Sequence, residues 1–278
     1  MEQSLIEQEK IIRLGFFFGV FILVALWEVV APRRPLIISK TLRWSANLGV
    51  VVLNTILLRL IFPTAAVGLA LVGEAKNWGL LNNIELPPIL GIIIGVVLLD
   101  FAIYSQHVMF HSVPTLWRLH RVHHADMEYD VTTGARFHPI EIILSMAIKL
   151  GVVLALGPSG VAVLIFEVLL NAMAMFNHGN IHIPVNIDRV LRMFVVTPDM
   201  HRVHHSVHAP MANSNFGFNL PWWDRLMGTY VAQPIEGHEN MEIGIKELRD
   251  PKLVSTIPGL LKLPFIQHLG EYTINRRW

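Results

Sequence analysis

The feature that most restricts the fold of this chain is a set of ten histidines that stand in four short groups between long apolar runs. The groups are His107-Val-Met-Phe-His111, His120-Arg-Val-His123-His124, His178-Gly-Asn-Ile-His182 and His201-Arg-Val-His204-His205. Neutral imidazole is the commonest side-chain ligand of transition metals. The repeated short spacings therefore predict that the fold brings these groups together into one polynuclear metal site.

The apolar runs predict an integral membrane protein made of helices. Hydrophobic residues form 53% of the chain and charged residues only 15%, whereas an average soluble domain is about one quarter charged. Runs of the length of a membrane helix cover residues 14–30, 44–62, 89–99 with its polar continuation, 140–156 and 161–176. We expect four to five membrane helices, since residues 63–72 either extend the second helix or re-enter the membrane.

The loop after the first apolar run sets the predicted orientation. Pro32-Arg33-Arg34-Pro35, with Lys40 and Arg43 after it, carries four basic residues and no acids, so the positive-inside rule places it in the cytoplasm. The acidic residues before the first run argue against a cleaved signal peptide. A turn at Gly157-Pro158-Ser159-Gly160 returns the chain to the same side. Every histidine group is then expected on the cytoplasmic face.

The spacing within the groups indicates how the histidines bind metal. Positions i, i+3 and i+4 of a helix share one face, so each His-Arg-Val-His-His motif is expected to direct three nitrogens to one region. Ten nitrogens suit two ions. Ligands that are all nitrogen favour iron, zinc, copper or nickel. The chain has no cysteine, which removes thiolate and iron–sulfur sites, and its net charge of +1 argues against nucleic acid as a partner.

Other polar residues are candidates to hydrogen bond the ligands, because metal-binding histidines usually donate their second N–H to a carboxylate or carbonyl. The first choices are His138, Asp100 and Asp199; further candidates are Asp126, Glu128, Glu141, Asn177 and Asn180. His138 could instead be a ligand or cap the helix that follows it. We expect His208, His238 and His268 to be ordinary surface residues.

Together these motifs resemble the fatty acid hydroxylase superfamily, which includes sterol desaturases and alkylglycerol monooxygenase. The resemblance covers about residues 87–230. It rests on Asp100-x-x-x-Tyr104-x-x-His107-x-x-x-His111, both His-Arg-Val-His-His motifs, Arg136-Phe-His138-Pro, the His178/His182 pair, Asn215-Phe-Gly-Phe-Asn219, Trp223-Asp224-Arg225 and Gly228-Thr229. One departure is Val108, where many members have arginine.

The resemblance implies a helical membrane anchor under a cytosolic helical cap, and a di-iron centre that uses O2 and supplied electrons. It carries the ten histidines over as ligands. The chain then divides into N-terminal membrane helices (1–86), a histidine-box catalytic core (87–230) and a C-terminal tail on the membrane surface (231–278), all within one membrane domain. Zinc can replace iron in purified protein.

The predicted function is hydroxylation or desaturation of a lipid, such as a sterol, a fatty acyl chain or an alkylglycerol. Attack on unactivated C–H bonds needs a redox metal or cofactor. The sequence has no recognisable flavin, haem or iron–sulfur module, so a separate cytochrome, ferredoxin or reductase is expected to supply electrons. Lipid-facing candidates near the site are Trp117, Phe137, Met173, Met175 and Phe176, although ordinary core packing explains each of them equally well.

Three alternative functions remain open at this point. A zinc-dependent membrane hydrolase would need open positions on its metal and a dedicated base. A metal transporter would carry its ligands near the middle of the bilayer, whereas here they cluster at helix ends. A b-type cytochrome would use isolated histidine pairs on facing helices rather than adjacent histidines.

Overall fold

A computed structural model of the protein describes residues 2–267 and Tyr272, and within them the chain is helical without a β-strand. Five segments are long and apolar enough to cross a membrane. They are α2 (Glu9–Val30), α3 (Lys40–Ile61) continued by α4 (Ala65–Ala75), α5 (Pro88–Ser112), α7 (Pro139–Leu156) and α8 (Gly160–Asn177). An 18-residue helix is about 27 Å long, which matches the roughly 30 Å hydrocarbon core of a bilayer.

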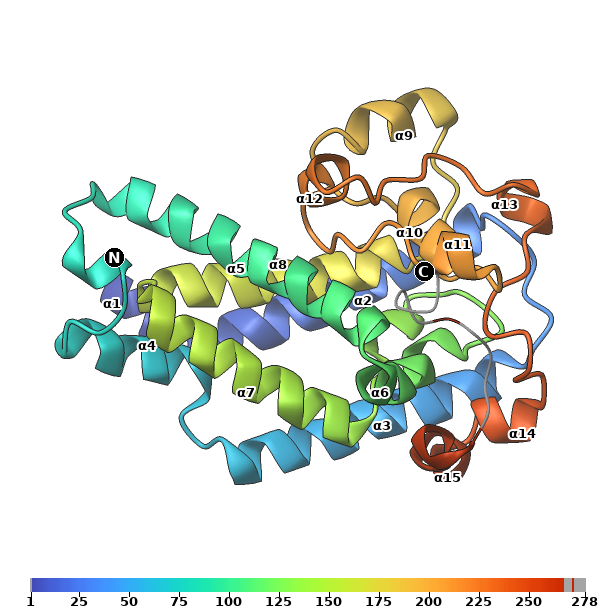
Figure 1. Cartoon of the computed structure of the whole chain (residues 1–278), viewed down its shortest axis with the longest axis horizontal. Coiled ribbons are helices and arrows are strands. Elements are labelled where there is room, and N and C mark those ends of the chain that lie inside the picture. Colours follow the sequence, from blue (N-terminus) through green and yellow to red (C-terminus); the bar gives the residue numbers. More distant parts are fainter. Residues whose placement is uncertain (1, 268–271, 273–278) are drawn as a thin grey trace.

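The second apolar run is one broken span. Helix α3 ends at Ile61 because Pro63 follows, and a residue before proline is pushed out of helical geometry. The chain resumes as α4, which continues towards the end of the bundle away from the histidines (Figure 1). Residues 63–72 thus extend the second span, which is one of the two predicted alternatives.

The long helices place all the histidine segments at one end of the bundle. Helices α5 and α8 run towards this end, and α7 starts from it (Figure 1). The predicted turn between α7 and α8 is confirmed. Gly157 ends α7 with φ +62°, and a Cβ there would lie 2.5 Å from the carbonyl oxygen of Trp78, so only glycine fits.

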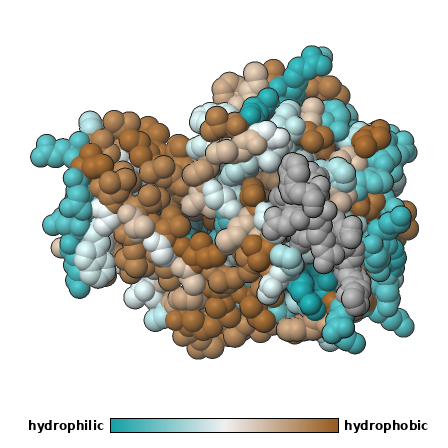
Figure 2. Space-filling view, viewed as in Figure 1, coloured by the Kyte–Doolittle hydropathy of each residue, from teal (hydrophilic) through white to brown (hydrophobic). Residues whose placement is uncertain are grey.

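Short helices form a cap over this end of the bundle (Figure 1). They are α6 (Pro114–His124), η2 (Thr133–Ala135), α9 (Val185–Leu191), α10 (Pro198–His204), α11 (Ala209–Ala212), α12 (Trp222–Leu226), α13 (Gly237–Asn240), α14 (Pro251–Val254), α15 (Ile257–Lys262) and η3 (Leu263–Phe265); α1 (Glu2–Glu7) and η1 (Leu81–Asn83) lie at the opposite end. Apolar side chains cover the bundle, whereas polar ones gather on the cap and at the opposite end (Figure 2).

A buried ion network fixes the loop that follows α6. The guanidinium group of Arg43, which is 0% exposed, donates to both carboxylate oxygens of Asp126 at 2.9 and 2.8 Å and also pairs with Asp130. Burial alone would raise the pKa of Asp126, but Arg43 and Arg136 lower it well below its usual range. Arg136 in turn donates to the carbonyl of Val122 at 2.8 Å. The network therefore ties α3 to the histidine-bearing turn of α6.

The C-terminal segment packs against α6. Arg121 donates to the carbonyl oxygens of Leu263 and Ile266, and Leu260 and Leu263 are buried. Its predicted place on the membrane surface stays a prediction, as does the division of the chain into three regions. Residues 268–271 and 273–278 of the predicted tail, His268 included, lie outside the described residues.

Replacement of Arg43 by leucine should destabilise the protein strongly. The change removes the guanidinium group that pairs with two buried carboxylates, and the loss of one partner of a buried ion pair costs roughly 3–5 kcal/mol. Thermal unfolding of the purified protein in detergent measures it. Arg59→Leu, an exposed site on the same helix, is the matched control and should change stability by less than about 0.5 kcal/mol. Equal midpoints for the two variants would contradict a stabilising role for the network.

Candidate metal centre

Nine of the ten predicted histidines come together in two buried groups at the capped end of the bundle. The five-histidine group is His107, His111, His120, His124 and His204, and the four-histidine group is His123, His178, His201 and His205. Within each group the potential ligand nitrogens lie within 4.8 Å of one another. The groups adjoin, since the rings of His124 and His205 stack with centroids 4.6 Å apart.

The two His-Arg-Val-His-His motifs share their histidines between both groups. In α6, His120 and His124 belong to the five-histidine group and His123 to the other; the residues of the α10 motif divide in the opposite sense. In each motif the two histidines four positions apart therefore belong to one group. The histidine three positions after the first belongs to the other group. The prediction that each motif directs all three nitrogens to one place was too simple, because i+3 and i+4 positions diverge by a fraction of a turn.

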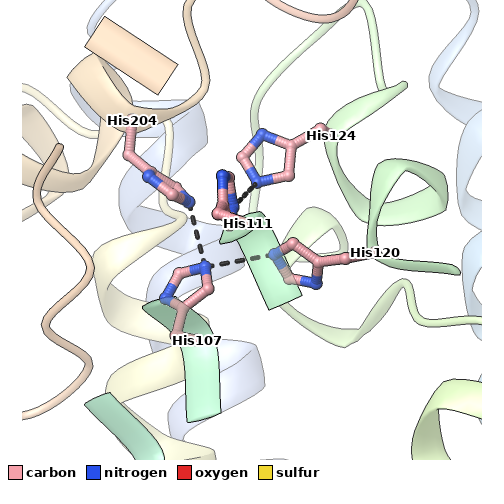
Figure 3. Close-up of side chains that lie close together, drawn as sticks. All are labelled: His107, His111, His120, His124 and His204. Atoms are coloured by element: carbon pink, nitrogen blue, oxygen red, sulfur yellow. Dashed lines mark hydrogen bonds between the residues drawn. The ribbon is translucent and has the colours of Figure 1, made fainter. Parts of the chain in front are cut away.

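The rings of the five-histidine group turn their Nε2 atoms inward (Figure 3). The Nε2 atom of His107 is 3.1 Å from that of His120 and 3.0 Å from that of His204, and the Nε2 atoms of His111 and His124 are 3.1 Å apart. Such spacings bring several lone pairs towards shared points, as a metal site requires.

Hydrogen bonds at the outer ring nitrogens hold this orientation. The Nδ1–H of His107 donates to the carbonyl of Phe216 at 2.8 Å, and that of His204 donates to the carbonyl of Ser214 at 2.7 Å. Likewise, His120 donates to the carboxylate of Glu141 at 2.6 Å. A bond of this kind fixes the tautomer and leaves the Nε2 lone pair free for a metal.

The four-histidine group is built in the same way, but fewer of its ring nitrogens have hydrogen-bond partners. His178 stands at the end of α8 and donates from Nδ1 to the carbonyl of Ala174 at 2.7 Å, while its Nε2 lies 3.2 Å from that of His123. Neither ring nitrogen of His205 has a hydrogen-bond partner within the described residues. Buried polar atoms are rarely left unpaired, so this group fits a bound ion.

The protonation state also fits metal binding. Burial lowers the pKa of His120 and of His178 to about 3. For His123 and His205, burial followed by neighbouring histidines lowers the pKa well below its usual value. A lowered pKa favours the neutral ring, which is the form that binds transition metals. The donor set therefore fits two transition-metal ions.

His182 lies apart from both groups, with an exposed side chain. The prediction grouped it with His178 across Gly179, a residue that weakens a helix. In the structure α8 ends at Asn177 and the chain then leaves helical geometry. Its backbone N–H instead donates to the carbonyl of Ala31 at 2.8 Å. We therefore expect nine histidine ligands rather than ten.

Of the candidate supporting residues, Glu141 is the carboxylate that contacts a histidine of the groups. Asp100 accepts from Trp223 at 2.8 Å, which anchors the loop that carries Phe216. Asp199 pairs with Arg202 and Arg33. Both aspartates act on neighbouring segments and not on a histidine ring of the two groups.

His138 caps the start of α7. Its Nδ1 accepts from the N–H of Ile140 at 3.2 Å, which is one of the three predicted alternatives, and no contact joins it to either group within the described residues. Among the predicted surface histidines, His208 is exposed and pairs with Glu236. His238 is buried, contrary to the prediction. Its Nε2 lies 2.9 Å from Oε1 of Gln233 and 3.6 Å from Oδ2 of Asp199.

The remaining candidates serve neighbouring loops. The carboxylate of Glu128 accepts from the N–H groups of Ile37 and Ile38. Asn177 donates to the carbonyl of Phe218, and Asn180 donates to the carbonyl of Arg34. They hold the segments on which the histidines stand.

The sequence analysis missed the acceptors between residues 213 and 216. Asn213 Oδ1 accepts from His111 at 3.2 Å, next to the carbonyls of Ser214 and Phe216. An asparagine side chain close to a histidine motif was a usable signal. The carbonyls carry none, since every residue has one.

A cavity of about 320 Å³ opens from the five-histidine group into the membrane bundle. His107 and His120 line one end, and most of the wall consists of apolar side chains of α2, α3, α5, α7 and α8. Of the predicted lipid-facing residues, Phe137 and Met175 line it. Trp117 instead stacks on Tyr272 with centroids 5.7 Å apart.

The fold and the site define a class: helical membrane proteins with a candidate dinuclear metal centre made of histidines. The fatty acid hydroxylase family model matches residues 92–229. Through this region the chain belongs to the fatty acid hydroxylase family, which confirms the resemblance seen in the motifs.

Several curated proteins are also similar to the chain in sequence. The chain is 29% identical to ornithine lipid hydroxylase OlsE of Rhizobium tropici over 51% of its own length and 42% of that protein. It is 28% identical to human alkylglycerol monooxygenase over 48% and 29% of the two chains. It is also 29% identical to Delta(7)-sterol-C5(6)-desaturase of Nicotiana tabacum over 51% and 49%. Each match spans less than half of the relative, and no solved structure matches the chain.

Metal analysis of variants tests the two groups. We expect two metal ions per chain in the wild type, about one or fewer in His124→Ala and in His205→Ala, and two in His182→Ala, which is the matched control. Elemental analysis of protein purified from iron-supplemented cells gives the ratio. Loss of metal from His182→Ala, or full metal in both other variants, would contradict the assignment.

Glu141 is expected to tune metal affinity through His120. Glu141→Ala removes the acceptor of the His120 Nδ1–H, and loss of such a partner weakens metal binding by about 10- to 100-fold. Glu141→Gln keeps an acceptor oxygen and should retain most of the affinity. Competition with a chelator measures both variants, and identical affinities for Glu141→Ala and the wild type would refute the role.

Proposed function

We propose that the protein is a membrane-bound di-iron oxygenase that hydroxylates or desaturates a lipid with O2 and external electrons. One observation carries this proposal: nine buried histidines form two adjoining groups at the end of a largely apolar cavity inside a membrane bundle. The printed names of the relatives, a lipid hydroxylase, a monooxygenase and a sterol desaturase, support the same reaction class.

The chemistry requires a redox centre that the side chains alone do not provide. Iron bound by the two groups would supply oxygen activation. Hydroxylation consumes one O2, two electrons and two protons, and it converts a C–H bond to C–OH with release of one water. Desaturation removes two hydrogens from adjacent carbons with the same oxidant and releases two waters.

The residues of the chain position the reactants. The histidines hold the metal, and their acceptors keep the rings from turning. The apolar wall of the cavity excludes water and binds a hydrocarbon chain, while Phe137 and Phe218 flank the end near the histidines. A carbon of the lipid is thereby presented to the centre in a dry environment, which suppresses side reactions.

Orientation and electron supply are parts of this proposal. The basic loop after α2 lies at the capped end, where Arg33 pairs with Asp199 and Arg34 donates to the carbonyl of Met241. The positive-inside rule then favours a cytoplasmic cap. Electrons come from a separate cytochrome, ferredoxin or reductase, which has access to the cap from the cytoplasm.

Lipid analysis under labelled oxygen tests the function. Cells that express the wild type, grown under ¹⁸O2, should accumulate a hydroxylated lipid that contains the label, or a lipid with one more double bond. His204→Ala should lose at least 99% of the product while the protein level stays unchanged, and His182→Ala serves as the control. No lipid difference between wild type and His204→Ala, with iron bound to the wild type, would overturn the proposal. Zinc-dependent release of fatty acid would support the hydrolase alternative.

A further inference from the structure

The cavity ends in a charged cluster on the side away from the histidines. The carboxylate of Glu167 on α8 pairs with Arg13 of α2 and with Lys149 of α7, at 2.6 Å in each case. The side chain of Glu167 is 2% exposed, and all three residues line the cavity. Three membrane helices thus bring ionisable groups to one point inside the bundle.

Charged groups within the bilayer are costly, and those that persist usually mark a functional site. Two cations, Arg13 and Lys149, face the carboxylate of Glu167. Glu9 also pairs with Arg13, but from outside the cavity wall. Glu167 uses one of the three N–H donors of the Lys149 ammonium group. The cluster therefore presents hydrogen-bond donors to a space that is otherwise largely apolar.

Further polar side chains follow the same wall. Gln106 donates to Ser145 at 3.0 Å, and Asn171 donates to the carbonyl of Glu167 at 2.8 Å. On α7, Lys149 stands eight residues after Glu141, the acceptor of His120, so the cluster lies about 12 Å from the histidine end along the helix. The cavity thus has polar side chains at both ends and along one wall, while the rest of its lining is apolar.

We propose that this cluster binds an oxygen-bearing end group of the substrate, a hydroxyl or a carboxylate, at Arg13 and Lys149. This inference rests on the proposed function and narrows its substrate class. The substrate is an amphiphile with a single chain or a slender ring system, held at its polar end by the cluster. The carbon that reacts lies at the other end of the cavity, so the distance between the two sites selects the position of attack.

A purely structural cluster would join α2, α7 and α8 without any preference for ligands. Binding measurements distinguish the two roles. The probe is tritiated dodecanoate on protein in nanodiscs, with unlabelled dodecanol and dodecane as competitors and empty nanodiscs as the blank. The wild type should prefer dodecanoate or dodecanol over dodecane by about tenfold, the effect of one hydrogen bond to a charged group. The better of the two identifies the end group.

Variants assign the preference to the cluster. Lys149→Met should abolish it, Lys149→Arg should keep it, and Lys252→Met, at an exposed lysine of the cap, should leave it unchanged. Thermal unfolding confirms that each variant is folded, and Arg13→Met replaces Lys149→Met if that variant does not fold. A wild type without preference, or equal preference in wild type and Lys149→Met, would overturn the inference.

The binding assay needs neither oxygen nor electrons. If a protein that makes an ¹⁸O-labelled product shows no selective binding, the end-group site is refuted and the proposed oxygenase function still stands. Selective binding in a protein without turnover would support the end-group site and count against the proposed oxygenase function.

Discussion

The hydrogen bond from the outer nitrogen of a histidine ring to a fixed acceptor is the interaction on which the geometry of the candidate metal centre depends. An imidazole on a flexible side chain can turn its lone pair in many directions. Here Glu141 and the carbonyls of Ala174, Ser214 and Phe216 each hold one ring in place. These acceptors come from distant parts of the chain, so the bundle and the cap have to be assembled before the two histidine groups can form.

Both the cap and the bundle hold the histidines in place. Helices α6 and α10 each contribute histidines to both groups, which makes the two groups parts of a single structure. The ion network around Arg43 joins α3 to the loop that follows α6. Asp100 accepts a hydrogen bond from Trp223 and so fixes the loop after residue 216. A buried ion network adds little stability relative to well-packed apolar residues, but once it is present the loss of one partner is costly.

Much of the fold was predictable because hydropathy and proline positions set the membrane helices directly. The histidine spacings predicted the site as well, since i, i+4 pairs on α5, α6 and α10 stay together. His182 departs from this rule because α8 stops at Asn177, and Gly179, a poor helix former between the two histidines, was the local signal. The division of each triple motif and the use of carbonyl acceptors depend on how helices cross, which is a tertiary property. The buried state of His238 has the same origin.

The segment from Asn213 to Phe216 has a consequence for variation in this chain. Two of its three contacts to histidine rings are made by backbone carbonyls, which any amino acid provides. Side chains at positions 214 and 216 can therefore change without removing those acceptors. A deletion or insertion of one residue would shift every carbonyl past its ring. The segment is thus strict in length, and its buried side chains add requirements of their own, because Phe216 packs against the rings of His107 and His204 and the amide of Asn215 donates to backbone carbonyls.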